Sequence, residues 1–466
     1  MSNRFMPRFI GKIIYDQEGE SYQRIFRYFL PEFITAFLIY SLPFWVDAYF
    51  IGSLKSTTTY ATVGVTGTLI HLLTKIAEGV SVGTLVLCGN FNGMGDFKDV
   101  GRSVRDAFWL NVAIGSVVAS LLYVGAPLIY TWYGVSEKMV LLGTPFLRMK
   151  AVSLFFMFVA SSFLGFMRGI KNTKVPMAIY VIGTVMFIFF DWLLIFGNGG
   201  FEPMGLQGSA IASIIQHGVM ALCAIAYVFL NPGNRKYGLE LFSLFDDISW
   251  IKRLLVLSVP VMIDKATVAL TYVWLSKLVC VMGKQGAAAF SVIKDMERFS
   301  ILPAVAFAQI VTLLVSNDYG GHNWTGIKSN IKKILLLSGC MVAVLVMFLA
   351  VYAQAVVQLF DQKDKFTQLA AFAYPFLGIL VFFDVLQLVL AGALRATGNV
   401  RLVMMVRVAV FVCFFIPVSY MFSQLEIAHT GIQFVLIYGT FYAGCAIMSL
   451  VFINRFRGQR WKTKVI

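Results

Sequence analysis

The sequence predicts an all-α protein that crosses a membrane many times, and three observations support this. Of the 466 residues, 59% are hydrophobic and only 13% are charged, about half the charged fraction of a soluble domain. The apolar residues form long blocks, whereas an outer-membrane barrel would show segments of about ten alternating residues. The basic residues lie between these blocks. A polytopic helical membrane protein accounts for all three.

The apolar blocks divide, at turn and charge signals, into about twelve helices of the length needed to cross a bilayer. Some blocks exceed one bilayer thickness and must tilt, kink or protrude, and Pro43 and Pro303 are the candidate kink sites. The expected spans are 28–52, 59–89, 105–133, 143–167, 175–197, 205–230, 254–282, 286–316, 331–360, 366–394, 402–423 and 430–453.

A long polar stretch at residues 231–251 separates the sixth and seventh expected spans and is the natural linker between two halves. The expected organisation is a cytoplasmic amino-terminal segment, two six-helix lobes and a basic cytoplasmic tail. These parts cover residues 1–27, 28–235 for the first lobe, 236–453 for the linker and second lobe, and 454–466 for the tail.

The distribution of the basic residues that give the net charge of +15 reflects how the chain crosses the membrane. Connectors rich in Lys and Arg alternate with connectors poor in them, which is the positive-inside pattern, so both termini are expected in the cytoplasm of a bacterial inner membrane. This distribution argues against nucleic acid as a partner. The six cysteines and four histidines are scattered without metal-ligand spacing, so neither a metal site nor a cofactor is expected.

An internal repeat relates the two halves. The segment Ser153–Met177 matches the segment ending at Met404 without gaps: Gly165 pairs with Gly392, and Arg168 with Arg395, each 227 residues apart. Such self-similarity indicates a duplication, and an even number of helices per copy relates the copies by an axis along the membrane normal. The paired arginines are interpreted as structural cations at cytoplasmic helix ends, with some role in gating between the lobes.

Four motifs extend the pattern over nearly the whole chain. They are PFWVDAYFIG (43–52), FLGFMRGIKNTKVPM (163–177), FFDWLLIFGNGGFEPMGLQGSAIAS (189–213) and FFDVLQLVLAGALRATGNV (382–400). Together they resemble the multidrug and toxic compound extrusion (MATE) family of the MOP flippase superfamily. The resemblance implies two six-helix lobes around a V-shaped cavity that alternates sides, and the export of organic cations driven by inward H⁺ or Na⁺.

The resemblance also implies which carboxylates couple to the ion. Asp47 matches the first-helix carboxylate of the family, and Asp191 matches a fifth-helix carboxylate of many prokaryotic members. Asp384, with Gln387 one turn later, is similar to the tenth-helix Asp-x-x-Gln of the Na⁺-coupled bacterial branch, so Na⁺ is possible at Asp384. All three acids lie in apolar blocks, where ionisable residues are usually functional.

The sequence departs from the family pattern at two positions. Phe187 stands where many members have Asn, and Val268 stands near the expected seventh-helix Glu, with Asp264 about one turn earlier as the nearest acid. These departures leave the choice between H⁺ and Na⁺ open. For Asp47 and Asp191 the alternative is a carboxylate near a membrane border, satisfied by a helix end or by water.

Asp384 has Met157 as its counterpart in the first half, 227 residues earlier. The duplication therefore does not require an acid here, and a partner in the second half must make it tolerable. Lys265 and Arg298 are candidate partners. An interhelical ion pair and an ion or substrate site both remain possible.

Two further helices carry charges that are candidates for a substrate cavity. In the second helix, Lys75 and Glu78 share one face and can neutralise each other. In the eighth, Lys294, Asp295, Glu297 and Arg298 fall within five residues, so they cannot all face one way and part of this cluster must meet an aqueous cavity or other charges.

The sequence thus predicts a monomeric, cation-coupled antiporter that exports organic, cationic or xenobiotic compounds by alternating access, with a small molecule and membrane lipid as partners. One alternative is a flippase of the same superfamily that moves lipid-linked oligosaccharide, whose anionic diphosphate would need the extra Lys and Arg. Another is a non-transporting scaffold or a channel. An enzyme is not expected, because no phosphate loop, metal cluster or nucleophile elbow occurs.

Overall fold

The computed structural model describes residues 16–242, 248–280, 282–358, 361, 366–425, 427 and 429–462, without the side chains at 43, 44, 47, 48, 57, 248, 249 and 284. Over these residues the chain consists of helices, turns and short connectors, and no strand occurs among them. Eleven helical spans within this part of the chain are long and apolar enough to cross a membrane. The predicted polytopic all-α class is confirmed.

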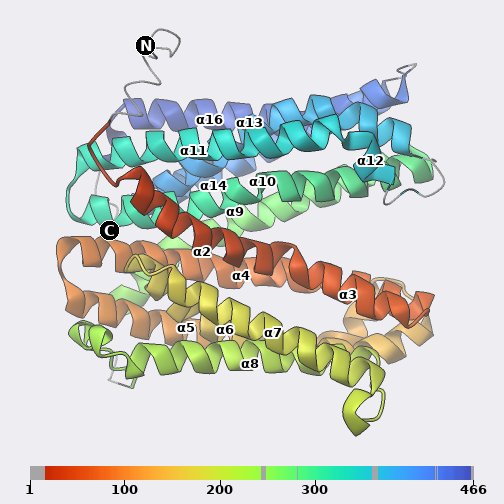
Figure 1. Ribbon diagram of the computed structural model, residues 1–466, viewed down its shortest axis with the longest axis horizontal. Coiled ribbons are helices and arrows are strands. Elements are labelled where there is room, and N and C mark those ends of the chain that lie inside the picture. Colours follow the sequence, from red (N-terminus) through yellow and green to blue (C-terminus); the bar gives the residue numbers. More distant parts are fainter. Residues whose placement is uncertain are drawn as a thin grey trace. The chain divides into compact units, whose positions relative to one another are not determined.

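The chain forms two compact units, each shown in Figure 1. The N unit is Ile34–Met262, and the C unit combines residues up to Phe33 with residues from Ile263 onward. The boundaries therefore fall inside α2 (Tyr22–Tyr40) and α9 (Ile248–Cys280), whereas the sequence placed the division around the polar connector at 231–251.

Close packing explains why the beginning of α9 belongs to the N unit. Gly79 and Gly83 of α4 lie so near Met262 and Ser258 of α9 that a Cβ at either glycine would collide with them. On the other side of the boundary, the Phe29 ring of α2 stacks on Phe307 in the C unit, with centroids 4.4 Å apart.

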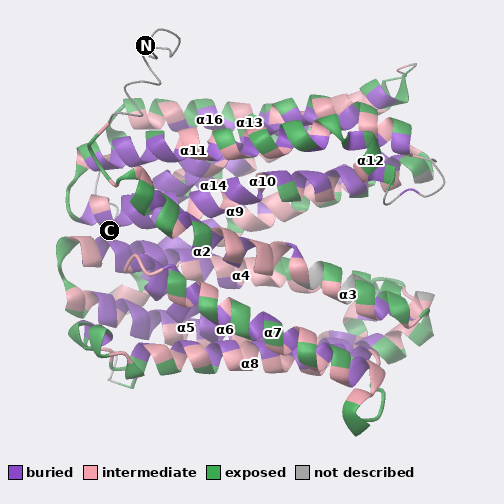
Figure 2. Cartoon of the chain, viewed as in Figure 1, coloured by how far each residue is buried: buried purple, intermediate pink, exposed green. Residues whose placement is uncertain are grey.

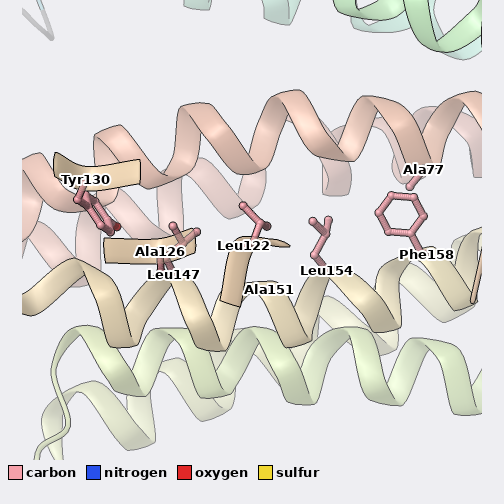
Figure 3. Packing of buried hydrophobic residues seen from close by; sticks show 8 residues of the cluster. All are labelled: Ala77, Leu122, Ala126, Tyr130, Leu147, Ala151, Leu154 and Phe158. Carbon is pink, nitrogen blue, oxygen red and sulfur yellow. The ribbon is translucent and has the colours of Figure 1, made fainter. Parts of the chain in front are cut away.

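In the N unit, α6 packs against α4, α5 and α8. Figure 3 shows the apolar contacts of this core, where Leu147, Leu154 and Phe158 of α6 face the neighbouring helices. Asp96 begins α5 by accepting a hydrogen bond from the Asp99 amide, just after Gly95 ends α4 in the left-handed conformation. The helices are α3 (Leu42–Ser53), α4 (Thr57–Met94), α5 (Phe97–Trp132), α6 (Glu137–Gly169), α7 (Lys174–Phe196) and α8 (Leu206–Leu230).

The first expected span, 28–52, is two helices instead of one. Helix α2 ends at Tyr40, and α3 begins at Leu42 with Pro43 in its first turn. Proline lacks an amide hydrogen and fixes its own φ, so it suits a helix start and breaks a helix that continues through it. The break is the reason why eleven continuous spans are found where about twelve were expected.

In the C unit, α13 packs against α10, α11 and α16 (Figure 1). The eleventh expected span is one continuous run in which a π turn (Phe411–Phe415) joins α14 to α15 just before Pro417. The helices are α10 (Gly283–Gly320), α11 (Trp324–Val351), α12 (Ala353–Gln358), α13 (Thr367–Ala396), α14 (Val400–Val410), α15 (Ile416–Gln424) and α16 (Thr430–Arg457).

The sequence repeat has a structural counterpart in the central helix of each unit. Helix α6 ends at Gly169 and α13 at Ala396, equivalent positions in the repeat. Shortly after each end one residue has a positive φ, at Lys171 and Gly398, again equivalent positions. The duplicated feature is therefore a central helix together with its terminating turn.

Burial separates the central helices from the peripheral ones. Helices α6, α10 and α13 are mostly buried along their apolar windows (Figure 2), whereas only a small share of the apolar windows of α5 and of the α14–α15 span is buried. The exposed side chains of these peripheral helices are largely apolar, including Leu121 and Val124 of α5. Apolar exposed helices suit contact with lipid, where all backbone polar groups are satisfied inside the helix.

Candidate functional site

A buried cluster of charges in the C unit centres on Asp264. This α9 carboxylate accepts hydrogen bonds from the guanidinium groups of Arg395 on α13 and Arg407 on α14. It is only 1% exposed. The acid that the sequence placed about one turn before an expected glutamate is thus the centre of an ion-pair triad that joins three helices.

Asp384 connects to this triad through Gln387. With its amide oriented to satisfy both neighbours, Gln387 donates to Asp384 Oδ1 at 3.1 Å and accepts from Arg407 Nη2 at 2.5 Å. The Cys445 thiol of α16 lies 3.6 Å from the same carboxylate oxygen. The expected proximity of Asp384 and Gln387 is confirmed, and the pair belongs to the Asp264 cluster.

The cation beside Asp384 is Arg407, whereas Lys265 and Arg298 had been the candidates. Sequence reasoning missed Arg407, although the signal was present: a single arginine inside the apolar run LVMMVRVAVFV. Lys265 follows Asp264 on α9 and is partly buried.

Glu297 of α10 is a further buried acid of the C unit, with an exposed fraction of 5%. It accepts hydrogen bonds from the hydroxyl groups of Tyr438 and Tyr442. These tyrosines stand four residues apart on α16 and therefore present one face. Asp295 and Arg298 pair with each other at 3.5 Å at a partly exposed position. The charges of the eighth helix do face different ways, as expected.

In the N unit, Lys75 and Glu78 form the expected pair. The Lys75 ammonium lies 2.7 Å from Glu78 Oε1. The Tyr40 hydroxyl donates to the same oxygen at 3.3 Å, and its ring lies 4.9 Å beneath the ammonium. Glu78 therefore receives two donors, and the ammonium gains a cation–π contact.

A second polar group of the N unit joins α6 to α8. Lys150 Nζ donates to Ser213 Oγ at 2.6 Å. Ser153 Oγ donates to the Ser213 carbonyl at 2.8 Å and lies 2.8 Å from His217 Nδ1. The sequence analysis did not single out this group. Its only signal in the sequence was helical spacing: Lys150 and Ser153 are three residues apart on α6, and Ser213 and His217 are four residues apart on α8.

The predicted ion-coupling acids of the N unit lie on different helices. Asp191 is fully buried on α7, and α7 packs against both α3 and α8. Asp47 belongs to α3, but its side chain lies outside the part that the structure describes. Their joint role in ion coupling stays a prediction.

The glycines of the repeat lie where two helices touch. A Cβ on Gly165 would approach the Ser81 carbonyl of α4 to 2.5 Å, and one on Gly392 would approach the Ala308 carbonyl of α10 to 2.8 Å. Arg168 and Arg395 occupy the last turns of α6 and α13. Arg395 has an additional role as a partner of Asp264.

Comparisons with known proteins agree with this architecture. The sequence profile of the MatE family matches residues 33–193 and 260–421. "Probable multidrug resistance protein YoeA" of Bacillus subtilis is 23% identical over 409 residues, which cover 85% of each chain. "Probable multidrug resistance protein NorM" of Thermotoga maritima is 21% identical over 337 residues, which cover 72% of each chain.

Solved structures share the fold at low sequence identity. One is the outward-facing conformation of a multidrug resistance MATE family transporter of the MOP superfamily, with a TM-score of 0.85 and 16% identity over 98% of this chain and 100% of that chain. A MOP superfamily transporter from Pyrococcus furiosus, described as having a binding pocket of reverse polarity, has a TM-score of 0.86 and 16% identity over 97% and 98%.

Proposed function

The chain belongs to the MatE family of membrane transporters, and we propose that it is an antiporter that exports organic cations, xenobiotics among them, in exchange for protons. The observation that carries this proposal is the linked set of buried carboxylates in the C unit: Asp264, Asp384 and Glu297. Charges inside membrane spans are costly, and they mark ion and substrate pathways. The relatives named as multidrug resistance proteins support a range of xenobiotic substrates.

The contacts of Asp384 argue against Na⁺ at this carboxylate. A sodium ion at Asp384 would lie close to the Arg407 guanidinium, which repels it and already interacts with the carboxylate. Na⁺ would also need several oxygen ligands, whereas the neighbours of Asp384 are a thiol, an amide nitrogen and a guanidinium. A proton needs only one oxygen, so exchange at another buried carboxyl of this set fits H⁺ better than Na⁺.

The same contacts make a lipid-linked oligosaccharide flippase the weaker alternative. Its anionic headgroup would need cations, but Arg395 and Arg407 both bind Asp264, and Lys75 binds Glu78. A cationic substrate matches an excess of buried acid better than an anionic one does.

We also propose that both termini lie in the cytoplasm. Residues near each terminus contact the beginning of α11: Lys333 Nζ donates to the Glu18 carbonyl at 2.6 Å, and the Trp461 ring packs on Trp324 with centroids 5.7 Å apart. These contacts support a location of both described ends of the chain on one side of the membrane, and the basic connectors favour the cytoplasmic side of an inner membrane.

The test is transport of ethidium by the full-length chain in proteoliposomes, with a pH gradient and a Na⁺ gradient imposed separately. We expect the pH gradient alone to drive ethidium movement and the Na⁺ gradient alone to have no effect. Movement driven by Na⁺ alone would overturn the assignment of the proton. Ethidium flux that depends on neither gradient would indicate a channel. A complete absence of ethidium flux would indicate a scaffold or a transporter of other solutes.

A further inference from the structure

In the cluster formed by Asp264, Asp384, Glu297 and their two arginines, one acid has no cation among its described contacts. Asp264 and Asp384 are two carboxylates, and Arg395 and Arg407 are two guanidinium groups in contact with them. Arginine remains protonated in proteins, so these four groups have no net charge. Glu297 is the third acid, and its buried carboxyl makes this part of the unit either neutral or singly negative.

The surroundings of Glu297 contain hydroxyl groups and acids. Within electrostatic range are Tyr272 from α9, Asp384 and Tyr374 from α13, and Tyr438, Tyr442 and Cys445 from α16. None of these described neighbours is a cation. Of the nearby charges on its own helix, Asp295 and Arg298 pair with each other, and Lys294 faces those two.

The other two acids are poor candidates for proton exchange. Asp264 is held by two permanent cations, and protonating it would leave both guanidinium groups buried without a partner. Asp384 has the field of Arg407 and a hydrogen bond from Gln387 to support its ionised form. Each carboxylate therefore serves as a fixed countercharge.

We infer that Glu297, held between Tyr438 and Tyr442, is the group of the C unit that binds the exchanged proton. This inference rests on the proposed antiport and names the acid that performs it. In the proton-bound state the carboxyl of Glu297 is neutral, and one tyrosine hydroxyl rotates so that its oxygen accepts a hydrogen bond from the carboxyl O–H. When the O–H bond breaks, the proton leaves to water, both tyrosines donate to the carboxylate, and an organic cation replaces the lost positive charge.

The test measures protons released when ethidium binds to the full-length protein in weakly buffered detergent solution, with a pH indicator dye. The wild type is expected to release about one proton for each ethidium bound, because one charge replaces another. Glu297→Gln is expected to bind ethidium without release, with an affinity that no longer depends on pH. Glu202→Gln, the same change at an exposed connector, is expected to behave as the wild type does. Proton release that persists in Glu297→Gln overturns the inference.

A second pair of variants keeps the test decisive where Glu297→Gln does not fold. The Tyr438→Phe, Tyr442→Phe double variant removes both donors to the carboxylate and so favours the protonated form. The midpoint of proton release is expected to move to higher pH. Tyr420→Phe, at an exposed site on α15, is the matched control. An unchanged midpoint in the double variant contradicts the inference.

Infrared spectroscopy separates failure of this inference from failure of the proposed function. A pH-difference spectrum of the wild type is expected to contain a protonated carboxyl C=O band that Glu297→Gln lacks, whatever the substrate is. A wild type that neither binds ethidium nor responds to a pH gradient refutes the proposed function, while the band still reports on Glu297. A band that remains in Glu297→Gln assigns the proton to another acid.

Discussion

The two units share a scaffold and differ in chemistry. In both, the central helix ends at the same position of the repeat, and a glycine lies against the carbonyl of a neighbouring helix. Several buried charged and polar side chains do not repeat. At the 227-residue offset, the counterparts of Asp384, Arg407, Lys150 and His217 are Met157, Tyr180, Leu377 and Gly444.

This difference shows which features a duplicated membrane fold retains. Helix–helix contacts through small residues depend on the backbone path, which the two units share. Polar side chains in the membrane must be compensated by specific partners, so each unit has built its own set. The C unit uses an acid–arginine cluster, and the N unit uses a lysine, two serines and a histidine.

The largest expected effect tests the Asp264 cluster of the C unit. Asp264→Asn leaves Arg395 and Arg407 buried without their shared carboxylate, and breaking a buried pair in this way costs about 3–5 kcal/mol. We expect a marked fall in the melting temperature of the detergent-solubilised protein. Asp295→Asn, which removes a half-exposed acid paired with Arg298, is the control and should cost less than about 1 kcal/mol. Equal melting temperatures for the two variants would contradict the central role of Asp264.

The next effect tests the feature that the units share. Gly165→Ala and Gly392→Ala each place a Cβ against a neighbouring backbone carbonyl, and overpacking of this kind costs about 1–3 kcal/mol. Both variants should lower the melting temperature by similar amounts. Gly339→Ala on α11, where the added Cβ meets open space, should leave it unchanged or raise it slightly. A strong effect in one unit alone would show that the shared helix contact is not equivalent.

A smaller effect is expected for the polar group of the N unit. Ser153→Ala removes the hydroxyl that contacts both the Ser213 carbonyl and His217, and such a loss costs about 1–2 kcal/mol. Thermal unfolding measures this cost. Ser423→Ala, at a partly exposed position, provides the baseline. Identical melting temperatures for the two variants would show that these contacts contribute little to the link between α6 and α8.

The smallest effect concerns the segment before α2, which contacts α11 of the C unit through Ser329 and Lys333. Desolvation raises the pKa of Asp16, but the hydrogen bond from the Glu18 amide and the charges of Lys333 and Lys332 outweigh it and hold this pKa below 3.8. A lowered pKa means that Asp16 contributes stability above pH 3.8, which is lost as pH falls through the folded-state value. Hydrogen exchange at residues 16–20 should therefore accelerate under acid conditions. Asp16→Asn should abolish this additional pH dependence.

Much of the fold could be predicted because it depends on local pattern. Apolar blocks of bilayer length gave the helices, and the constant offset gave the repeat. The break at Ser41 was signalled by Pro43, although the two short helices were expected to be one span. The unit boundaries were not predictable, because they depend on which neighbour the first turns of α9 pack against.

The site was predictable only where its partners are close in sequence. Lys75 with Glu78, and Asp384 with Gln387, lie within one helical turn, so spacing alone placed them together. Asp264 and Arg395 are 131 residues apart, and Glu297 is 141 residues from Tyr438. Helical periodicity describes one helix at a time and says nothing about which helices become neighbours.

The Asp264 triad also has a mechanical consequence. The two helices that pass from one unit to the other, α2 and α9, are each fastened within a few residues of the passage: Phe29 stacks on Phe307, and Asp264 binds two arginines. Each fastening lies on the C-unit side. Helix α9 is also held before the passage, where Met262 packs against Gly79 of α4, so little of α9 is left to bend between Met262 and Asp264.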